Sequence, residues 1–163
     1  MKLHRNLFVI FVLSYASISV GDPYTEIVDA LLAEEPEIAL RVLQENQNLP
    51  AATNDKGETL LHLATLNPED VQVLQSLLSL LPPNSPMINH RDRGGMTPLH
   101  WAVVNGHINA VKFFLAHGAD GTLRDRNNKT PLDLAIASGQ TAIKELLQAR
   151  SPSAARLLCL PIF

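Results

Sequence analysis

The 163-residue sequence is poor in cysteine and aromatic residues and has no surplus of basic side chains. Its one cysteine, Cys159, excludes an intrachain disulfide and a cysteine-based metal site, so stability must come from packing. A net charge of −3 argues against nucleic acid as the main partner, because proteins that bind nucleic acid usually carry a basic surplus. With 46% hydrophobic and 18% charged residues, the chain has the composition of a folded domain.

The longest apolar run lies at the N-terminus and has the order of a secretory signal. Lys2 and Arg5 precede the apolar residues 7–13, and small residues follow as far as Gly21. A membrane-anchoring helix needs roughly 20 apolar residues, and three serines interrupt this run too early. We therefore predict that residues 1–21 are a signal peptide, cleaved after Gly21 or alternatively after Ser19. The mature chain would be periplasmic or secreted, without membrane attachment.

The rest of the chain contains an internal repeat. TPLHWA at 97–102 aligns with TPLDLA at 130–135 after a shift of 33 residues, and more loosely with TLLHLA at 59–64 after a shift of 38. Before each copy, an Asp or Asn stands three residues ahead of Gly57, Gly95 or Asn128. Such residues favour Asx-turns and positive φ, so each copy is predicted to follow a tight turn.

Helical periodicity follows each turn. After Thr97, a candidate N-cap, Pro98 can occupy the first helical turn, and apolar residues recur at i, i+3 and i+4. Asn105-Gly106 is predicted to end this helix, and a second helix is expected from about His107 to near Gly118. The repeating unit is therefore a turn, a helix, a tight turn and a second helix.

This unit resembles the ankyrin repeat, whose motif is D-x-x-G-x-T-P-L-H-x-A followed by G-H and G-A-D. The copy from Asp125 carries Asp133 in place of the motif histidine. The copy from Asn54 has Leu60 in place of proline and Pro68 where Gly-His is expected. The best copy matches at Asp92, Gly95, Thr97, Pro98, Leu99, His100, Ala102, Gly106, His107, Gly118, Ala119 and Asp120.

The resemblance covers nearly all of the chain after the signal. Two helical segments at 25–34 and 36–45 lack the motif and are interpreted as a degenerate first repeat, because a terminal repeat has one face in water. About five extra residues around LPPNSP, 81–86, lengthen one link. We predict an all-α solenoid of about four ankyrin-like repeats at approximately 22–53, 54–91, 92–124 and 125–150, followed by a tail at 151–163.

The histidines are predicted to be structural. In the ankyrin family the motif's histidine and threonine help to tie neighbouring turns together, which implies this role for His62, His100 and Asp133. A histidine pair that binds a metal or takes part in acid–base catalysis is expected to have i, i+4 spacing or a carboxylate partner. His100 and His107 are seven residues apart. We therefore expect no catalytic residue, no metal, no cofactor and no enzymatic activity.

The resemblance implies a protein partner, contacted by the turn tips and the exposed side of the inner helices. Arg91 and Arg124 are 33 residues apart, as are Arg93 and Arg126, which predicts a basic ladder for an acidic patch on the partner. The alternative is that Asp92 and Asp125 merely pair with these arginines. The candidate contact residues are Arg91, Arg93, Met96, Trp101, Val104, Asn105, Arg124, Arg126 and Lys129, with Ala137 and Ser138 beside them.

Several alternatives stay open from the sequence. The binding module, expected to be a monomer, is either a structural or chaperone-like subunit that holds a periplasmic enzyme, or a secreted effector acting on a host protein; an enzyme is much less favoured. Trp101 is either a core residue or a contact residue. The segment Asn128-Lys129-Thr130 matches a glycosylation sequon, which matters only in a eukaryote. The apolar end RLLCLPIF, 156–163, either covers the open face of the last repeat or docks on a partner.

Overall fold

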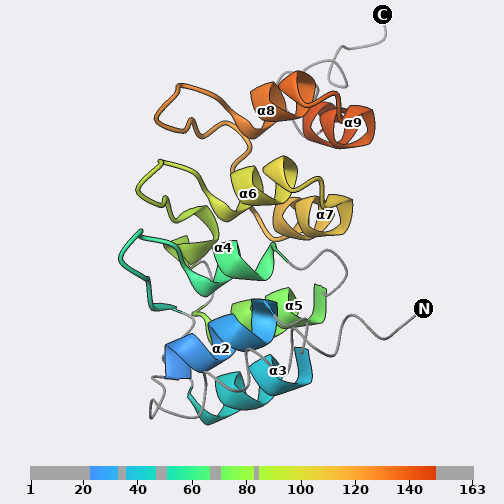
Figure 1. Cartoon of the computed structure of the whole chain (residues 1–163). Coiled ribbons are helices and arrows are strands. Elements are labelled where there is room, and N and C mark those ends of the chain that lie inside the picture. Colours follow the sequence, from blue (N-terminus) through green and yellow to red (C-terminus); the bar gives the residue numbers. More distant parts are fainter. Residues whose placement is uncertain (1–22, 33–35, 47–50, 67–70, 83–84, 150–163) are drawn as a thin grey trace, which may run out of the picture.

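A computed structural model describes residues 23–32, 36–46, 51–66, 71–82 and 85–149. These residues form a stack of helix pairs (Figure 1), which confirms the all-α prediction. The predicted signal peptide at 1–21 and the tail at 151–163 lie outside the described residues. The helices are α2 (Pro23–Leu32), α3 (Pro36–Glu45), α4 (Leu60–Ala64), α5 (Val71–Leu80), the 3₁₀ helix η2 (Pro86–Asn89), α6 (Pro98–Val104), α7 (Ile108–Ala116), α8 (Pro131–Ala137) and α9 (Thr141–Ala149).

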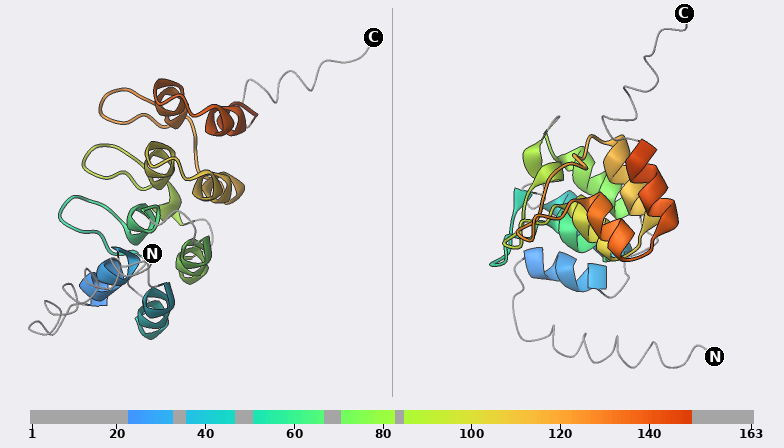
Figure 2. Two further views of the ribbon diagram at one scale, coloured as in Figure 1. Left: turned by 45° about the vertical axis from the view of Figure 1, so that its right-hand side comes forward. Right: turned by 90° about the horizontal axis from the view of Figure 1, so that it is seen from above.

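The helices are arranged in two columns. Inner helices α2, α4, α6 and α8 contact one another in that order, and outer helices α3, α5, α7 and α9 do the same. Figure 2 shows both columns, and the loops before α4, α6 and α8 project from the same side of the stack. This is the stacked geometry of a solenoid, in which each repeat buries its apolar face against its neighbours.

Local sequence explains why the inner helices are short. Thr97 and Thr130 are N-caps with extended backbone, and the proline after each supplies the preset φ of a first helical turn. Gly106 and Gly139 then adopt positive φ of 75° and 68°, which a residue with a side chain rarely tolerates. Helices α6 and α8, of seven residues each, therefore end within two turns, and the chain reverses into the outer helix.

One continuous core runs through the stack, from Ile27 in α2 to Leu147 in α9. The motif leucines Leu61 and Leu99 are fully buried in it, as is Phe114 of α7. The two upstream helices pair as expected, although the first begins at Pro23 rather than at residue 25. The exact repeat boundaries stay predictions. In the described part of the chain, no helix has the length and apolar character needed to cross a membrane.

Candidate protein-binding surface

Each projecting loop is a hairpin organised by one acidic or amide side chain. Asp125 Oδ1 accepts hydrogen bonds from the amides of Asn127 and Lys129, both at 2.8 Å. Burial alone would raise the pKa of Asp125, but these hydrogen bonds outweigh it and hold the pKa below its ordinary value. Asn54 makes the equivalent bonds in the first hairpin, and Asp92 Oδ1 accepts from the Met96 amide in the second. The predicted Asx-turns are confirmed at Asn54 and Asp125, where the side-chain oxygen accepts from the amide two residues on.

A residue with positive φ allows the tight turn in each of the same hairpins. Gly57, Gly95 and Asn128 have φ of 74°, 76° and 61°, as their positions in the repeat predict. Neighbouring hairpins are joined by backbone hydrogen bonds, from Arg93 N to Lys56 O at 2.8 Å and from Arg126 N to Gly94 O at 2.9 Å. The three hairpins therefore form a continuous row of tips.

The motif histidines tie each repeat to the next hairpin. His62 Nδ1 accepts from the amide of Thr59 at 3.1 Å, and Nε2 therefore donates to Met96 O at 3.1 Å. His100 repeats the arrangement, with Nε2 donating to Lys129 O at 3.2 Å. Burial lowers the pKa of both rings, because it penalises the charged form. The predicted structural role of these histidines is confirmed.

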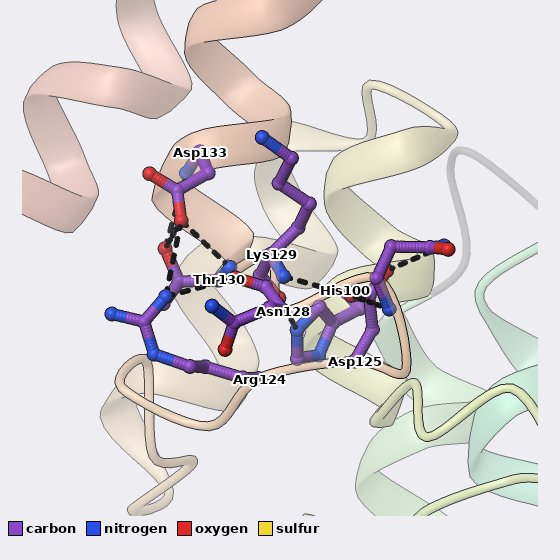
Figure 3. Close-up of polar contacts among 8 residues, drawn as sticks. His100, Arg124, Asp125, Asn128, Lys129, Thr130 and Asp133 are labelled. Carbon is purple, nitrogen blue, oxygen red and sulfur yellow. Dashed lines mark hydrogen bonds and ion pairs between the residues drawn. The ribbon is translucent and has the colours of Figure 1, made fainter.

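Asp133 replaces the histidine in the last repeat and caps its own helix (Figure 3). Its Oδ2 accepts from the amide and the hydroxyl of Thr130, both at 2.9 Å, and lies 3.9 Å from Arg124 Nη1. These hydrogen bonds from Thr130 lower the pKa of Asp133. Among the described residues no further hairpin follows α8, so a side chain that donates to one is not needed here.

Two of the four arginines in the predicted ladder brace the hairpins. Arg91 Nε donates to Gly95 O at 3.1 Å, and its Nη2 donates to the carbonyl of Arg124 in the next hairpin. Arg124 Nη1 in turn donates to Asn128 O at 2.8 Å. Both side chains remain exposed, but part of their donor capacity is used within the repeat row.

The other two arginines are exposed on adjacent tips. Arg93 and Arg126 are exposed, and among the described residues neither side chain has a recorded hydrogen bond or ion pair. The expected alternative, in which Asp92 and Asp125 pair with arginines, is not observed in the described part of the chain. Those carboxylates instead accept bonds within their own repeats, including one from Trp101 Nε1 to Asp92 Oδ2 at 3.0 Å.

The inner helices contribute an apolar side to the same surface. Trp101 is half-buried and its ring meets His62 edge-to-face at 5.6 Å, so it packs on the core while keeping part of its face in solvent. Val104 is 52% exposed, and Leu66, at the same position of the preceding repeat, is 38% exposed. Sequence reasoning did not select Leu66, although aligning TLLHLATL with TPLHWAVV places it opposite Val104.

The remaining predicted contact residues are exposed or half-buried. Asn105 Nδ2 donates to Thr65 O at 3.4 Å, and His107 Nδ1 donates to the same carbonyl at 2.6 Å. Met96 is half-buried, whereas Asn105, Lys129, Ala137 and Ser138 are exposed. The role of all these residues in partner contact stays a prediction. Within the described ranges, no three His, Cys, Asp or Glu side chains gather as a metal site would require.

The sequence matches known proteins in these repeats. Residues 70–155 match the family described as ankyrin repeats in three copies. The chain is 44% identical to mouse ankyrin repeat family A protein 2 over 55 residues, 34% of this chain and 18% of that protein. It is 33% identical over 92 residues to the Saccharomyces cerevisiae target of rapamycin complex 2 subunit AVO2, covering 56% of this chain and 21% of that protein.

A third relative covers more of the chain. The chicken nuclear factor NF-kappa-B p105 subunit is 32% identical over 108 residues, 65% of this chain and 11% of that protein. The chain thus spans only about a fifth or less of the length of these relatives. The family match at residues 70–155 includes α5 to α9 and the hairpins before α6 and α8. The chain belongs to the ankyrin repeat family.

Proposed function

We propose that this chain is an exported binding module that binds a partner protein through its hairpin tips and the exposed side of its inner helices. Ankyrin repeats imply binding to a protein, and solenoids offer extended surfaces for it. The main observation that supports this location is the pair Arg93 and Arg126, whose exposed side chains on adjacent tips make no hydrogen bond or ion pair within the described part of the chain.

The chemistry of this pair selects a partner with an acidic patch. Guanidinium groups form bidentate hydrogen bonds with carboxylates, and two of them on joined hairpins present a fixed spacing. Lys129, exposed on the last hairpin, adds a third positive charge. The chain as a whole carries a net charge of −3. The basic tips therefore give this surface a local positive charge, opposite in sign to the net charge of the protein.

The apolar side chains next to the tips supply the other part of the contact. Leu66, two residues after the end of α4, and Val104, the last residue of α6, occupy equivalent positions of their repeats, and half-buried Trp101 lies one turn before Val104. Interfaces commonly combine a buried aromatic or aliphatic centre with a polar, charged rim. We infer that the partner places apolar side chains against the inner helices and acidic ones against the tips.

The proposed compartment rests on the N-terminal residues. The order of basic, apolar and small residues in 1–21 is that of a secretory signal. A partner recovered from the producing cell's own exported proteins supports a holding subunit, and one recovered only from a host supports an effector.

The test compares charge reversal on the tips with equal reversal elsewhere. The native cell is treated with a crosslinker and the partner is identified by mass spectrometry, after which its affinity is measured for the wild type and for Arg93→Glu with Arg126→Glu. The control is Arg41→Glu with Lys112→Glu, which changes the net charge equally on exposed positions of the outer helices α3 and α7. Circular dichroism checks that each variant is folded.

The tip variant should bind at least about tenfold more weakly, mainly through slower association, and wild-type association should slow as salt rises. The outer-helix control should bind like the wild type. Equal affinities for the folded tip variant and the wild type would refute the proposed contact.

A further inference from the structure

Among the described residues, the last repeat leaves an apolar face open at the end of the stack. Ile136 of α8 is 54% exposed, whereas Val103, the residue at the same position of α6, is 0% exposed because α8 covers it. Leu132 is likewise only half-buried, and its counterpart Leu99 is fully buried. In Figure 1, α8 and α9 lie at one end of the described stack. The same positions that bury a repeat interface elsewhere are therefore uncovered here.

An open hollow of about 480 Å³ adjoins this face where α9 ends. Its lining includes Leu132 of α8, Leu147 in the last turn of α9 and the loop from Gly118 to Thr122. Because Leu132 belongs both to the hollow and to the open face, a chain that leaves α9 can fill the first and continue over the second.

Asp133 indicates that this face is not built for another hairpin of the same kind. At the equivalent positions His62 and His100 donate a hydrogen bond to a carbonyl of the next hairpin. A carboxylate cannot donate, and Asp133 accepts from Thr130 instead. The face therefore suits a segment that contributes apolar side chains without a hairpin.

We propose that residues 156–163, RLLCLPIF, bind in cis against the open face of α8 and the adjoining hollow, as a terminal cap of the solenoid. The segment has five large apolar side chains in eight residues, and it follows α9 after residues 150–155. Six extended residues span up to about 20 Å, whereas the seven residues of α8 extend about 10 Å. Attachment to the same chain favours this occupant over a free one, because the effective concentration is in the millimolar range.

The single native cysteine provides a direct test of this contact. The full chain carrying Ile136→Cys is oxidised under mild conditions, and the products are separated by size and mapped by mass spectrometry. The control is Asp55→Cys, an exposed position on the hairpin before α4, two repeats away. A disulfide requires Cα atoms within roughly 7 Å, so only a neighbouring thiol reacts efficiently with Cys159.

Cap binding predicts an intrachain link between position 136 and Cys159, formed at least about tenfold faster than in the Asp55→Cys control. A link between two chains instead would show that a second copy covers the face. Equal trapping at positions 136 and 55, or none at either, would show that the segment does not bind there. A link between two chains, equal trapping at the two positions and the absence of trapping would each overturn the proposal.

A second measurement does not depend on an introduced thiol. Leu157→Ser with Leu160→Ser should accelerate amide hydrogen exchange in α8 and α9 by about tenfold or more, while α4 exchanges as before, since repeats are stabilised by their neighbours. Arg156→Ser is the matched control in the same segment and should leave α8 unchanged. Identical exchange in the wild type and the double variant contradicts the cap.

Discussion

His62 Nε2 donates to the carbonyl oxygen of Met96 across 3.1 Å, so a side chain of one repeat holds the backbone of the next. The bond works only with the neutral ring, because Nδ1 accepts from the Thr59 amide and has no room for a proton of its own. His100 stands in the same relationship to Lys129. The stacking of the repeats therefore depends on two buried, neutral histidines.

Acid should destabilise the fold in the range of histidine titration. The pKa of both His62 and His100 is lowered by burial, so below about pH 6.5 the unfolded chain binds protons that the folded chain does not. The contribution of the two neutral rings to the free energy of unfolding is therefore fully present above that pH. It is lost as the pH is lowered further, by up to about 1.4 kcal/mol per pH unit for each ring. Urea unfolding at pH 7.5, 6.5 and 5.5 measures this, and a flat profile contradicts it.

Exchanging the motif histidine and its aspartate replacement should change stability by very different amounts. His100→Asp places a carboxylate in a fully buried site and removes the bond to Lys129 O, which should cost about 3 kcal/mol or more. Asp133→His keeps a partner for Thr130 on a half-buried helix start and should change stability by less than about 1 kcal/mol. Equal losses in denaturant unfolding would refute the assigned roles.

Gly95 should tolerate a side chain less well than Gly118, although both have positive φ. A Cβ at Gly95 would lie 3.0 Å from Arg126 N and 3.0 Å from Arg91 Nη2, whereas one at Gly118 meets nothing within 4 Å. Gly118→Ala should cost only the backbone penalty of about 1 kcal/mol. Gly95→Ala should cost more, about 2–3 kcal/mol, because the hairpins must also separate. Thermal unfolding of the pair checks the order.

The native protein should begin near Asp22. The basic, apolar and small residues of 1–21 predict removal of this segment on export. Intact-mass and N-terminal peptide measurements on protein from its own cell should lack Met1 through Gly21, or through Ser19 if the second cleavage site is used. Cellular protein that retains Met1 would rule out a cleaved signal.

The repeat units themselves were predictable, because their signals are local. Thr97 with Pro98 starts a helix, Gly106 ends it, and Asp92 with Gly95 closes the hairpin, each through contacts within a few residues of itself. A shift of 33 residues repeats the same chemistry at Asp125 and Thr130. The sequence by itself therefore determined the hairpins and inner helices of the clear copies, the repeat and the family, whereas the 3₁₀ helix η2 in the lengthened link was not predicted.

Tertiary structure decided which side chains are available to a partner. Arg91 and Arg93 look alike in the sequence. Of the two, only Arg91 donates side-chain hydrogen bonds to a carbonyl of its own hairpin and to a carbonyl of the next hairpin. Val103 and Ile136 are similar apolar residues at one position of the motif, yet the first is buried and the second is exposed. Burial and pairing here depend on whether another repeat lies alongside, a contact between residues more than 30 positions apart that no local pattern contains.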